Sequence, residues 1–145
     1  MIALACDHGG FELMGLVKQL FDEQGYKYKD FGTFSDESVD YPVFAALAGR
    51  AVADGLCDKG ILICGTGIGM SIAANKISGI RAALCTSTFM AEMTRRHNDA
   101  NILCLGERIL EPETAIEIVK VFLSTDFDGG RHSRRVEMLD NNLTT

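Results

Sequence analysis

The sequence predicts one α/β domain, a three-layer α/β/α sandwich on a five-stranded parallel sheet of the Rossmann-like class. Five short aliphatic and β-branched runs recur along the chain, and the spacing leaves room for one helix between consecutive runs. The apolar residues between the runs repeat every three or four positions, which is the period of an amphipathic helix. The chain of 145 residues also has the length of a single domain, so we treat 1–145 as one unit.

The predicted strands are residues 2–6, 26–31, 60–64, 80–85 and 102–105. A first helix begins near Phe11 and ends before Gly25, a residue typical of a helix C-terminal cap. Pro42 and Pro112 suit the first turn of a helix, where a missing N–H costs nothing. Further helices are therefore expected at about 42–55, 68–77, 87–97 and 112–124, with a short final helix after residue 131.

Composition and charge exclude several classes of protein. Hydrophobic residues make up 47% of the chain, which argues against disorder, and the net charge of −6 argues against a nucleic-acid partner. No apolar run reaches the ~18 residues that a membrane span needs, and the N-terminus lacks the features of a signal peptide. The five cysteines are an odd number without a C-x-x-C pair. We expect a cytoplasmic protein with reduced thiols and no membrane partner.

In an open parallel sheet, ligands bind at the carboxyl ends of the strands. The segment after the third predicted strand is Cys64-Gly65-Thr66-Gly67-Ile68-Gly69. Alternating glycines between a strand and a helix expose backbone N–H groups on a concave turn, and the helix dipole adds to their effect. Such a turn would stabilise a phosphate, an enediolate oxygen or a thiolate on Cys64. The alternative is a plain tight turn with a buried cysteine.

Two other segments reach the same edge. Asp7 and His8 follow the first strand and place a carboxylate beside an imidazole, although Asp7 has an ordinary alternative role as a helix cap. Arg108 follows the fifth strand. These residues are candidates for ligand binding.

Basic residues gather at two further places, the segment Arg95-Arg96-His97-Asn98-Asp99 and the run containing Arg131, His132, Arg134 and Arg135. Arginine suits fork-like recognition of phosphate, although most charge runs are only solvated. Helices of a βαβ unit run antiparallel to the strands, so both places lie on the amino edge, opposite Cys64. If they serve the Cys64 pocket, they come from a second subunit, and the C-terminal tail of about 128–145 reaches that partner.

Motifs along nearly the whole chain carry a family resemblance. They are C-D-H-x-G at 6–10, D-Y-P at 40–42, I-C-G-T-G-I-G at 63–69, S-I-A-A-N-K at 71–76, G-I-R-A at 79–82, R-x-H-N-D at 95–99 and G-G-R-H-x-x-R-V-E at 129–137. With these motifs the chain closely resembles the type B ribose-5-phosphate isomerases, which share a superfamily with the galactose-6-phosphate isomerase subunits.

The resemblance implies an aldose–ketose isomerase of the pentose phosphate pathway, which interconverts ribose 5-phosphate and ribulose 5-phosphate through a cis-enediolate. It implies no cofactor or metal, and a homodimer or dimer of dimers whose sites lie between subunits. It further implies that Cys64 is the catalytic base, that His97 opens the sugar ring and that Thr66 orients an oxygen or the thiol. The implied substrate-binding residues are Asp7, His8, Gly65, Thr66, Gly67, Ile68, Gly69, Asn98, Arg108, Arg131 and Arg135.

One branch of the family lacks the cysteine and carries a glutamate directly after the glycine loop. Position 70 is Met here, so the chain resembles the cysteine branch. Two alternatives remain open at this point. One is an isomerase of allose 6-phosphate or galactose 6-phosphate, and the other is a non-catalytic phosphate-binding α/β module.

Overall fold

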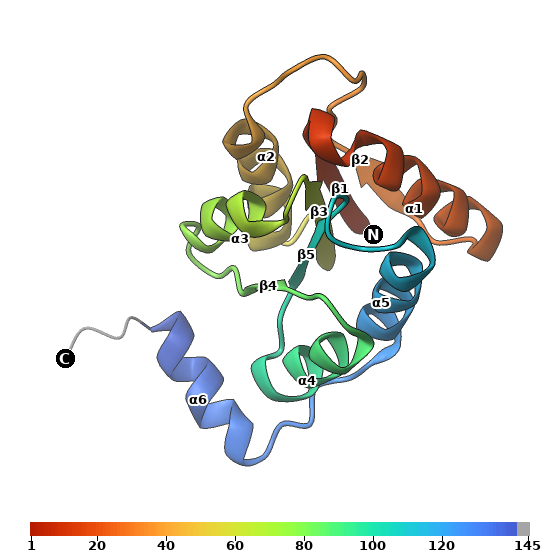
Figure 1. Ribbon diagram of the computed structural model, residues 1–145. Coiled ribbons are helices and arrows are strands. Elements are labelled where there is room, and N and C mark those ends of the chain that lie inside the picture. The colour runs from red at the N-terminus through yellow and green to blue at the C-terminus, as the bar shows by residue number, and fades with distance from the viewer. Residues whose placement is uncertain (142–145) are drawn as a thin grey trace.

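Five parallel strands form the centre of the computed structural model, which describes residues 1–141 (Figure 1). The sheet order is β2-β1-β3-β5-β4, and its strands are β1 (Ile2–Cys6), β2 (Tyr28–Asp30), β3 (Lys59–Cys64), β4 (Ala82–Leu84) and β5 (Ile102–Gly106). The three central strands β1, β3 and β5 are almost wholly buried, which explains their continuous apolar sequences. The strand order reverses beside β1 and β3, so a crevice is expected where these two strands end.

Helices cover both faces of the sheet. The helices are α1 (Phe11–Gln24), α2 (Tyr41–Ala53), α3 (Ile68–Asn75), α4 (Thr88–Asn98), α5 (Pro112–Ser124) and α6 (Arg131–Asp140), and a short 3-10 helix, η1 (His8–Gly10), precedes α1. Alternate strand residues face opposite layers, so Leu4 packs with α1, α4 and α5, whereas Ala3 packs with α2 and α3. This arrangement is the predicted three-layer sandwich.

Local signals in the sequence explain most helix ends. Gly25 adopts a left-handed conformation with φ 75° and its N–H bonds the carbonyl of Phe21, which ends α1. Ser87 caps α4, since its side chain accepts a hydrogen bond from the N–H of Met90. Pro42 and Pro112 lie in the first turns of α2 and α5, as predicted. The outer strands β2 and β4 are shorter than predicted, because pairing stops where the edge strands leave the sheet.

Helix α6 is unlike the others, because it stands away from the sheet beside α4 (Figure 1). Val136 is its one buried residue. The predicted tail of 128–145 includes this helix, and its residues 142–145 lie outside the described part of the chain. Within residues 1–141, no helix is long and apolar enough to cross a membrane.

Candidate active site

The glycine loop between β3 and α3 shapes the environment of Cys64. Gly67 has φ 78°, a left-handed conformation that costs glycine little and other residues much. This turn aims the N–H of Gly67 at the Sγ of Cys64, with 3.1 Å between nitrogen and sulfur. An N–H donor beside the N-terminus of a helix stabilises a thiolate. The loop therefore turns the chain and also places a hydrogen-bond donor at the Cys64 sulfur.

Arg108 closes one side of this loop. The N–H groups of Glu107 and Arg108 donate to the carbonyls of Cys64 and Gly65 over 3.0 and 2.9 Å, which extends the β3–β5 pairing into the two loops. A Cβ at Gly65 would lie only 2.9 Å from Nη1 of Arg108. The absence of a side chain at position 65 thus lets the guanidinium lie directly over the loop, where it adds a positive charge.

Asp7 and His8 border the same crevice from the end of β1. Asp7 is 7% exposed, and its carboxylate accepts a hydrogen bond from the N–H of Gly9 over 2.8 Å, so it does cap η1. The Nδ1 of His8 accepts from the N–H of Val39 over 3.2 Å. In the neutral ring this leaves the proton on Nε2, which can donate to a ligand. His8 also anchors the loop that leads into α2.

A cavity of about 400 Å³ opens above the thiol, within the range usual for small-molecule sites. Its lining comes from four loops and helix starts at the carboxyl edge and consists of Asp7, Tyr41, Cys64, Gly65, Thr66, Ile68, Gly69, Ile72 and Arg108. Sequence reasoning assigned no role to Tyr41 or Ile72. The start of a helix that follows a strand belongs to the carboxyl edge, and that signal would have pointed to Tyr41.

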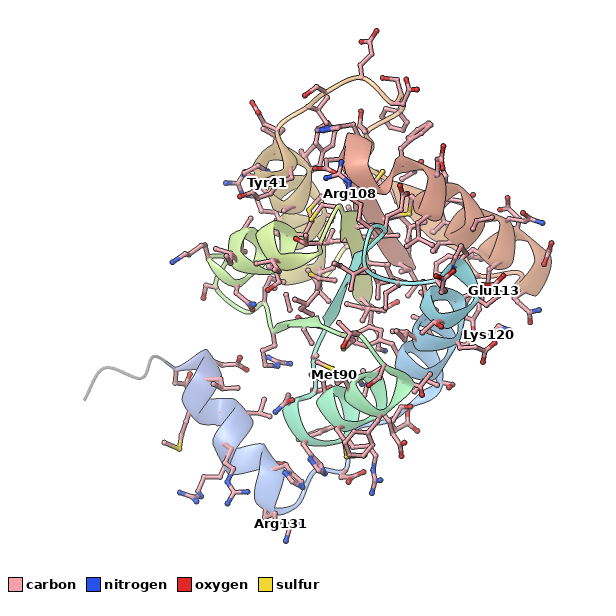
Figure 2. All side chains as sticks on the ribbon, in the orientation of Figure 1. Tyr41, Met90, Arg108, Glu113, Lys120 and Arg131 are labelled. Carbon is pink, nitrogen blue, oxygen red and sulfur yellow. The ribbon has the colours of Figure 1, made fainter. Side chains whose placement is uncertain are left out.

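The remaining predicted residues lie elsewhere. His97 and Asn98 end α4, and Arg131 and Arg135 belong to α6, as the topology predicts for the amino edge. Arg108 and Tyr41 lie at one end of the molecule and Arg131 at the other (Figure 2). One chain therefore brings together the Cys64 half of the predicted set and keeps the His97 half apart.

The His97 region has its own structure. The ring of His97 stacks on that of His132, with centroids 4.2 Å apart and an interplanar angle of 11°. Together with Asp128 these histidines form the one group among residues 1–141 whose ligand atoms, all within 4.8 Å of each other, could hold a metal. However, Arg96 donates to both carboxylate oxygens of Asp128 over 3.2 Å, and Arg131 lies beside His132 in sequence. This positive surrounding favours an anion over a cation.

The five cysteines differ in their surroundings, although all are unpaired and buried. Burial raises the pKa of Cys6 to about 12 and that of Cys85 to about 11. Burial also raises the pKa of Cys57, and that of Cys104 well above its usual value. These four thiols stay protonated near neutral pH, whereas Cys64 lines an open cavity and has the Gly67 N–H at its sulfur.

Brief treatment of the native protein with iodoacetamide at pH 7.5 should therefore alkylate Cys64 at least about tenfold faster than any other cysteine, because burial keeps the other four thiols protonated whereas Cys64 lines the cavity. Peptide mass spectrometry measures this. Cys85 is a matched comparison, because it also ends a run at the carboxyl edge. Equal labelling of Cys64 and Cys85 would contradict the assignment of Cys64 as the reactive thiol.

Comparison with known proteins identifies the fold and the family. The model of the Ribose/Galactose Isomerase family matches residues 2–139. Ribose-5-phosphate isomerase B of Escherichia coli is 47% identical over 138 residues, covering 95% of this chain and 93% of that protein.

Two solved structures are similar to this chain over nearly its whole length. The ribose-5-phosphate isomerases B of Clostridium thermocellum and Thermotoga maritima each superpose with a TM-score of 0.95 at 51% identity, over 97% of this chain. The alignment covers 95% of the first structure and 97% of the second. This chain belongs to the ribose/galactose isomerase family.

Proposed function

We propose that this protein is an aldose–ketose isomerase that interconverts D-ribose 5-phosphate and D-ribulose 5-phosphate, a step of the pentose phosphate pathway, with Cys64 as the base. The observation that carries the proposal is the Cys64 sulfur, which lines a cavity and accepts the Gly67 N–H. The names of the relatives in Escherichia coli, Clostridium thermocellum and Thermotoga maritima support the five-carbon substrate.

The chemistry follows from what the crevice offers. The Cys64 thiolate removes the proton from C2 of the open-chain aldose, and negative charge develops on the oxygen at C1. Backbone N–H groups of the glycine loop and the N-terminus of α3 face that charge and stabilise the cis-enediolate. The Cys64 thiol then returns the proton to C1, while a proton moves from the oxygen at C2 to that at C1. Thr66 orients an oxygen or the thiol, and Asp7, His8 and Arg108 hold the substrate.

The half of the site that carries His97 comes, in this proposal, from a second subunit. His97 moves the proton that opens the furanose ring, Asn98 contacts the sugar, and Arg131 and Arg135 bind the phosphate. Binding energy at the phosphate positions C2 against the thiolate. The opposite placement of Arg108 and Arg131 in one chain supports this division (Figure 2).

Exposed apolar side chains around the crevice support a homodimer. On α2, Val43 and Leu47 are 56% and 44% exposed, and on α3 Ile68 and Ile72 are 51% and 56% exposed. Ile68 and Ile72 also line the cavity. An apolar surface of this kind, continuous with a ligand site, is typical of a protein interface. A two-fold axis would then complete two equal sites.

The chemistry above uses only side chains, backbone groups and the substrate, so we propose that no cofactor or metal takes part. Five unpaired cysteines support a reducing compartment, and we propose the cytoplasm. A coupled assay for ribulose 5-phosphate formation from ribose 5-phosphate tests the activity directly. Allose 6-phosphate and galactose 6-phosphate in parallel reactions test the six-carbon alternatives, and binding without turnover on any of them would favour a phosphate-binding module.

Substitution Cys64→Ser should lower turnover by roughly 10²- to 10⁴-fold, because a hydroxyl is a far weaker base at neutral pH. Substrate affinity, measured by calorimetry, should stay close to that of the parent protein. Cys85→Ala is the control, since it removes a buried thiol outside the cavity and should leave turnover unchanged. Parental turnover by Cys64→Ser would refute the assignment of the base.

Substitution His97→Asn should affect the cyclic substrate more than the open chain, because ring opening is the step that His97 assists. Ribose 5-phosphate, which is mainly a furanose, should lose at least about tenfold in kcat/KM, and 4-deoxyribose 5-phosphate, which lacks the hydroxyl that closes the furanose ring, should lose less. Initial rates on the two aldoses measure the difference, because the forward and reverse kcat/KM of a single reaction must fall together. Equal losses on both aldoses would argue against a role in ring opening.

A further inference from the structure

Helix α6 has little apolar contact to fix its position. Val136 is the one buried residue of the helix, and Met138 and Leu139 are about half exposed at 51% and 50%. Yet the proposed function requires that α6 hold Arg131 and Arg135 in one orientation toward a neighbouring subunit. Polar contacts at its two ends must therefore supply the rigidity that the apolar core does not.

The N-terminal end of α6 is tied to α4. The N–H of Asp128 donates to the carbonyl of Arg96 over 3.0 Å, and the Nε of Arg96 donates to both carboxylate oxygens of Asp128. One turn further along, His132 stacks on His97. These contacts hold the start of the helix.

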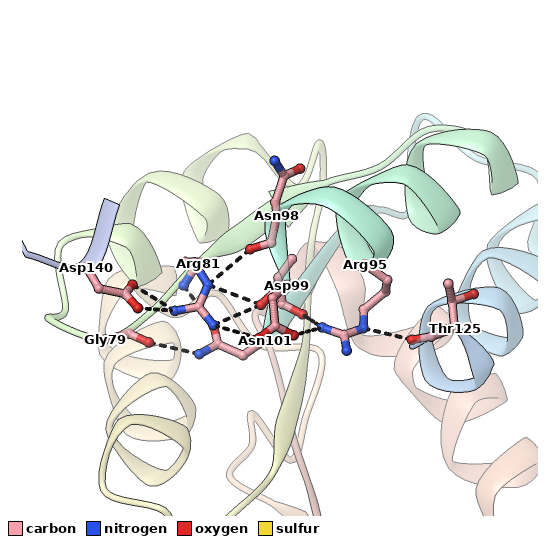
Figure 3. Close-up of polar contacts among 9 residues, drawn as sticks. Gly79, Arg81, Arg95, Asn98, Asp99, Asn101, Thr125 and Asp140 are labelled. Atoms are coloured by element: carbon pink, nitrogen blue, oxygen red, sulfur yellow. Dashed lines mark hydrogen bonds and ion pairs between the residues drawn. The ribbon is translucent and has the colours of Figure 1, made fainter. Parts of the chain in front are cut away.

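Arg81 holds the opposite end (Figure 3). Its Nη1 donates to both carboxylate oxygens of Asp140 over 2.7 and 2.9 Å. Its Nε donates to the carbonyls of Asn98 and Asp99, each over 3.1 Å, and its Nη2 donates to the Asp99 carbonyl over 3.0 Å. The side chain of Arg81 is only 16% exposed. A single guanidinium thus joins the last residue of α6 to the residues that follow His97.

The backbone around Arg81, to which Asp140 is tied, is itself held by hydrogen bonds. Asn101 accepts a hydrogen bond from the N–H of Arg81 over 2.8 Å and donates to the carbonyl of Gly79 over 2.8 Å, which fixes the backbone on both sides of position 80 (Figure 3). Asp99 has φ 47° as the C-cap of α4, and its carboxylate accepts from Arg95 over 2.8 Å. Arg95 in turn donates to the carbonyl of Thr125 at the end of α5.

We propose that Arg81 is a positioning residue for the isomerase reaction, which clamps Asp140 to the end of α4 and so sets where α6 presents Arg131 and Arg135. The inference rests on the proposed function, in which these arginines bind the substrate phosphate. It also gives a role to Arg81 of the G-I-R-A motif at 79–82, which lies outside the Cys64 cavity.

Release of the clamp has a defined kinetic consequence. The thiol and the glycine loop keep their places when Asp140 is lost, because no hydrogen bond within residues 1–141 joins them to α6. His97 keeps its place because the start of α6, where His132 stacks on it, stays tied to α4 through Asp128 and Arg96. The phosphate arginines lose orientation in the free enzyme and regain it when the substrate binds, so the bound substrate still has C2 against the thiolate, and KM rises while kcat stays the same. A lysine cannot replace Arg81, because it lacks the fork that reaches both helices.

The test compares Asp140→Ala with the parent enzyme. Asp140→Ala should raise KM for ribose 5-phosphate about three- to tenfold with kcat within about twofold, as expected for loss of a partly exposed ion pair in which Nη1 of Arg81 contacts both carboxylate oxygens. Arg81→Lys should reproduce the rise in KM. Asp140→Asn keeps one hydrogen bond to Arg81, so its KM should lie between those of the parent enzyme and Asp140→Ala. Light scattering and thermal melting check that each variant has the parental assembly state and a nearly parental melting temperature.

A matched control separates positioning from general stability. Lys18→Gln breaks the Lys18–Asp30 ion pair, which is comparably buried but lies on α1 and β2, and it should leave KM unchanged. The decisive experiment repeats Asp140→Ala in a variant that already carries Arg131→Ala and Arg135→Ala. Both arginines that the clamp would position are then absent, so Asp140→Ala should cause no further loss in kcat/KM.

An unchanged KM in Asp140→Ala, or an added loss that persists without the two arginines, overturns the clamp while the proposed function stands. If the double arginine variant itself keeps parental kcat/KM, the phosphate assignment of the proposed function is wrong, and the clamp falls with it. A fall in kcat and melting temperature at constant KM would indicate a merely structural contact.

Discussion

The direction of the chain in a parallel sheet constrains every other feature of this molecule. Each strand ends at the carboxyl edge, and each helix that follows runs back and ends at the amino edge. Cys64, Asp7 and Arg108 follow strands, so they converge on one crevice. His97 ends a helix and Arg131 begins the one that stands away from the sheet, so both lie at the far end. One chain keeps these two sets apart, and in the proposed homodimer a two-fold axis would bring them together.

Within the crevice, backbone geometry separates one cysteine from four others. All five thiols are buried in the same small domain, and burial alone makes a thiol inert, as the raised pKa values of Cys6 and Cys85 illustrate. Cys64 differs because a left-handed glycine directs an N–H at its sulfur, and because Gly65 lets Arg108 approach. The glycines of this loop therefore determine what surrounds the Cys64 sulfur through the contacts that they permit.

Within residues 1–141 the sequence predicted the fold class, the five strands, the six α-helices and the sheet edge that carries the Cys64 cavity, because these depend on periodicity and on short-range caps such as Gly25 and Ser87. It predicted the Cys64 half of the crevice because those residues directly follow strands. The sequence did not predict the contacts between segments that are far apart in the chain. The carboxylate of Glu107 accepts from the N–H of Leu13 at the start of α1, and Arg81 reaches Asp140. Such pairs depend on how loops pack in three dimensions, and no local pattern marks them.

A subunit-complementation assay tests most directly whether the site is shared. Cys64→Ser and His97→Asn chains, each with activity on ribose 5-phosphate reduced at least about tenfold when alone, are denatured, mixed in equal amounts and refolded together. If the halves come from different subunits, each mixed dimer contains one site with both native residues. Random association then restores about a quarter of the parental activity. If Cys64 and His97 act within one chain, every site keeps a defect, and an activity no higher than that of the separate variants would contradict the account.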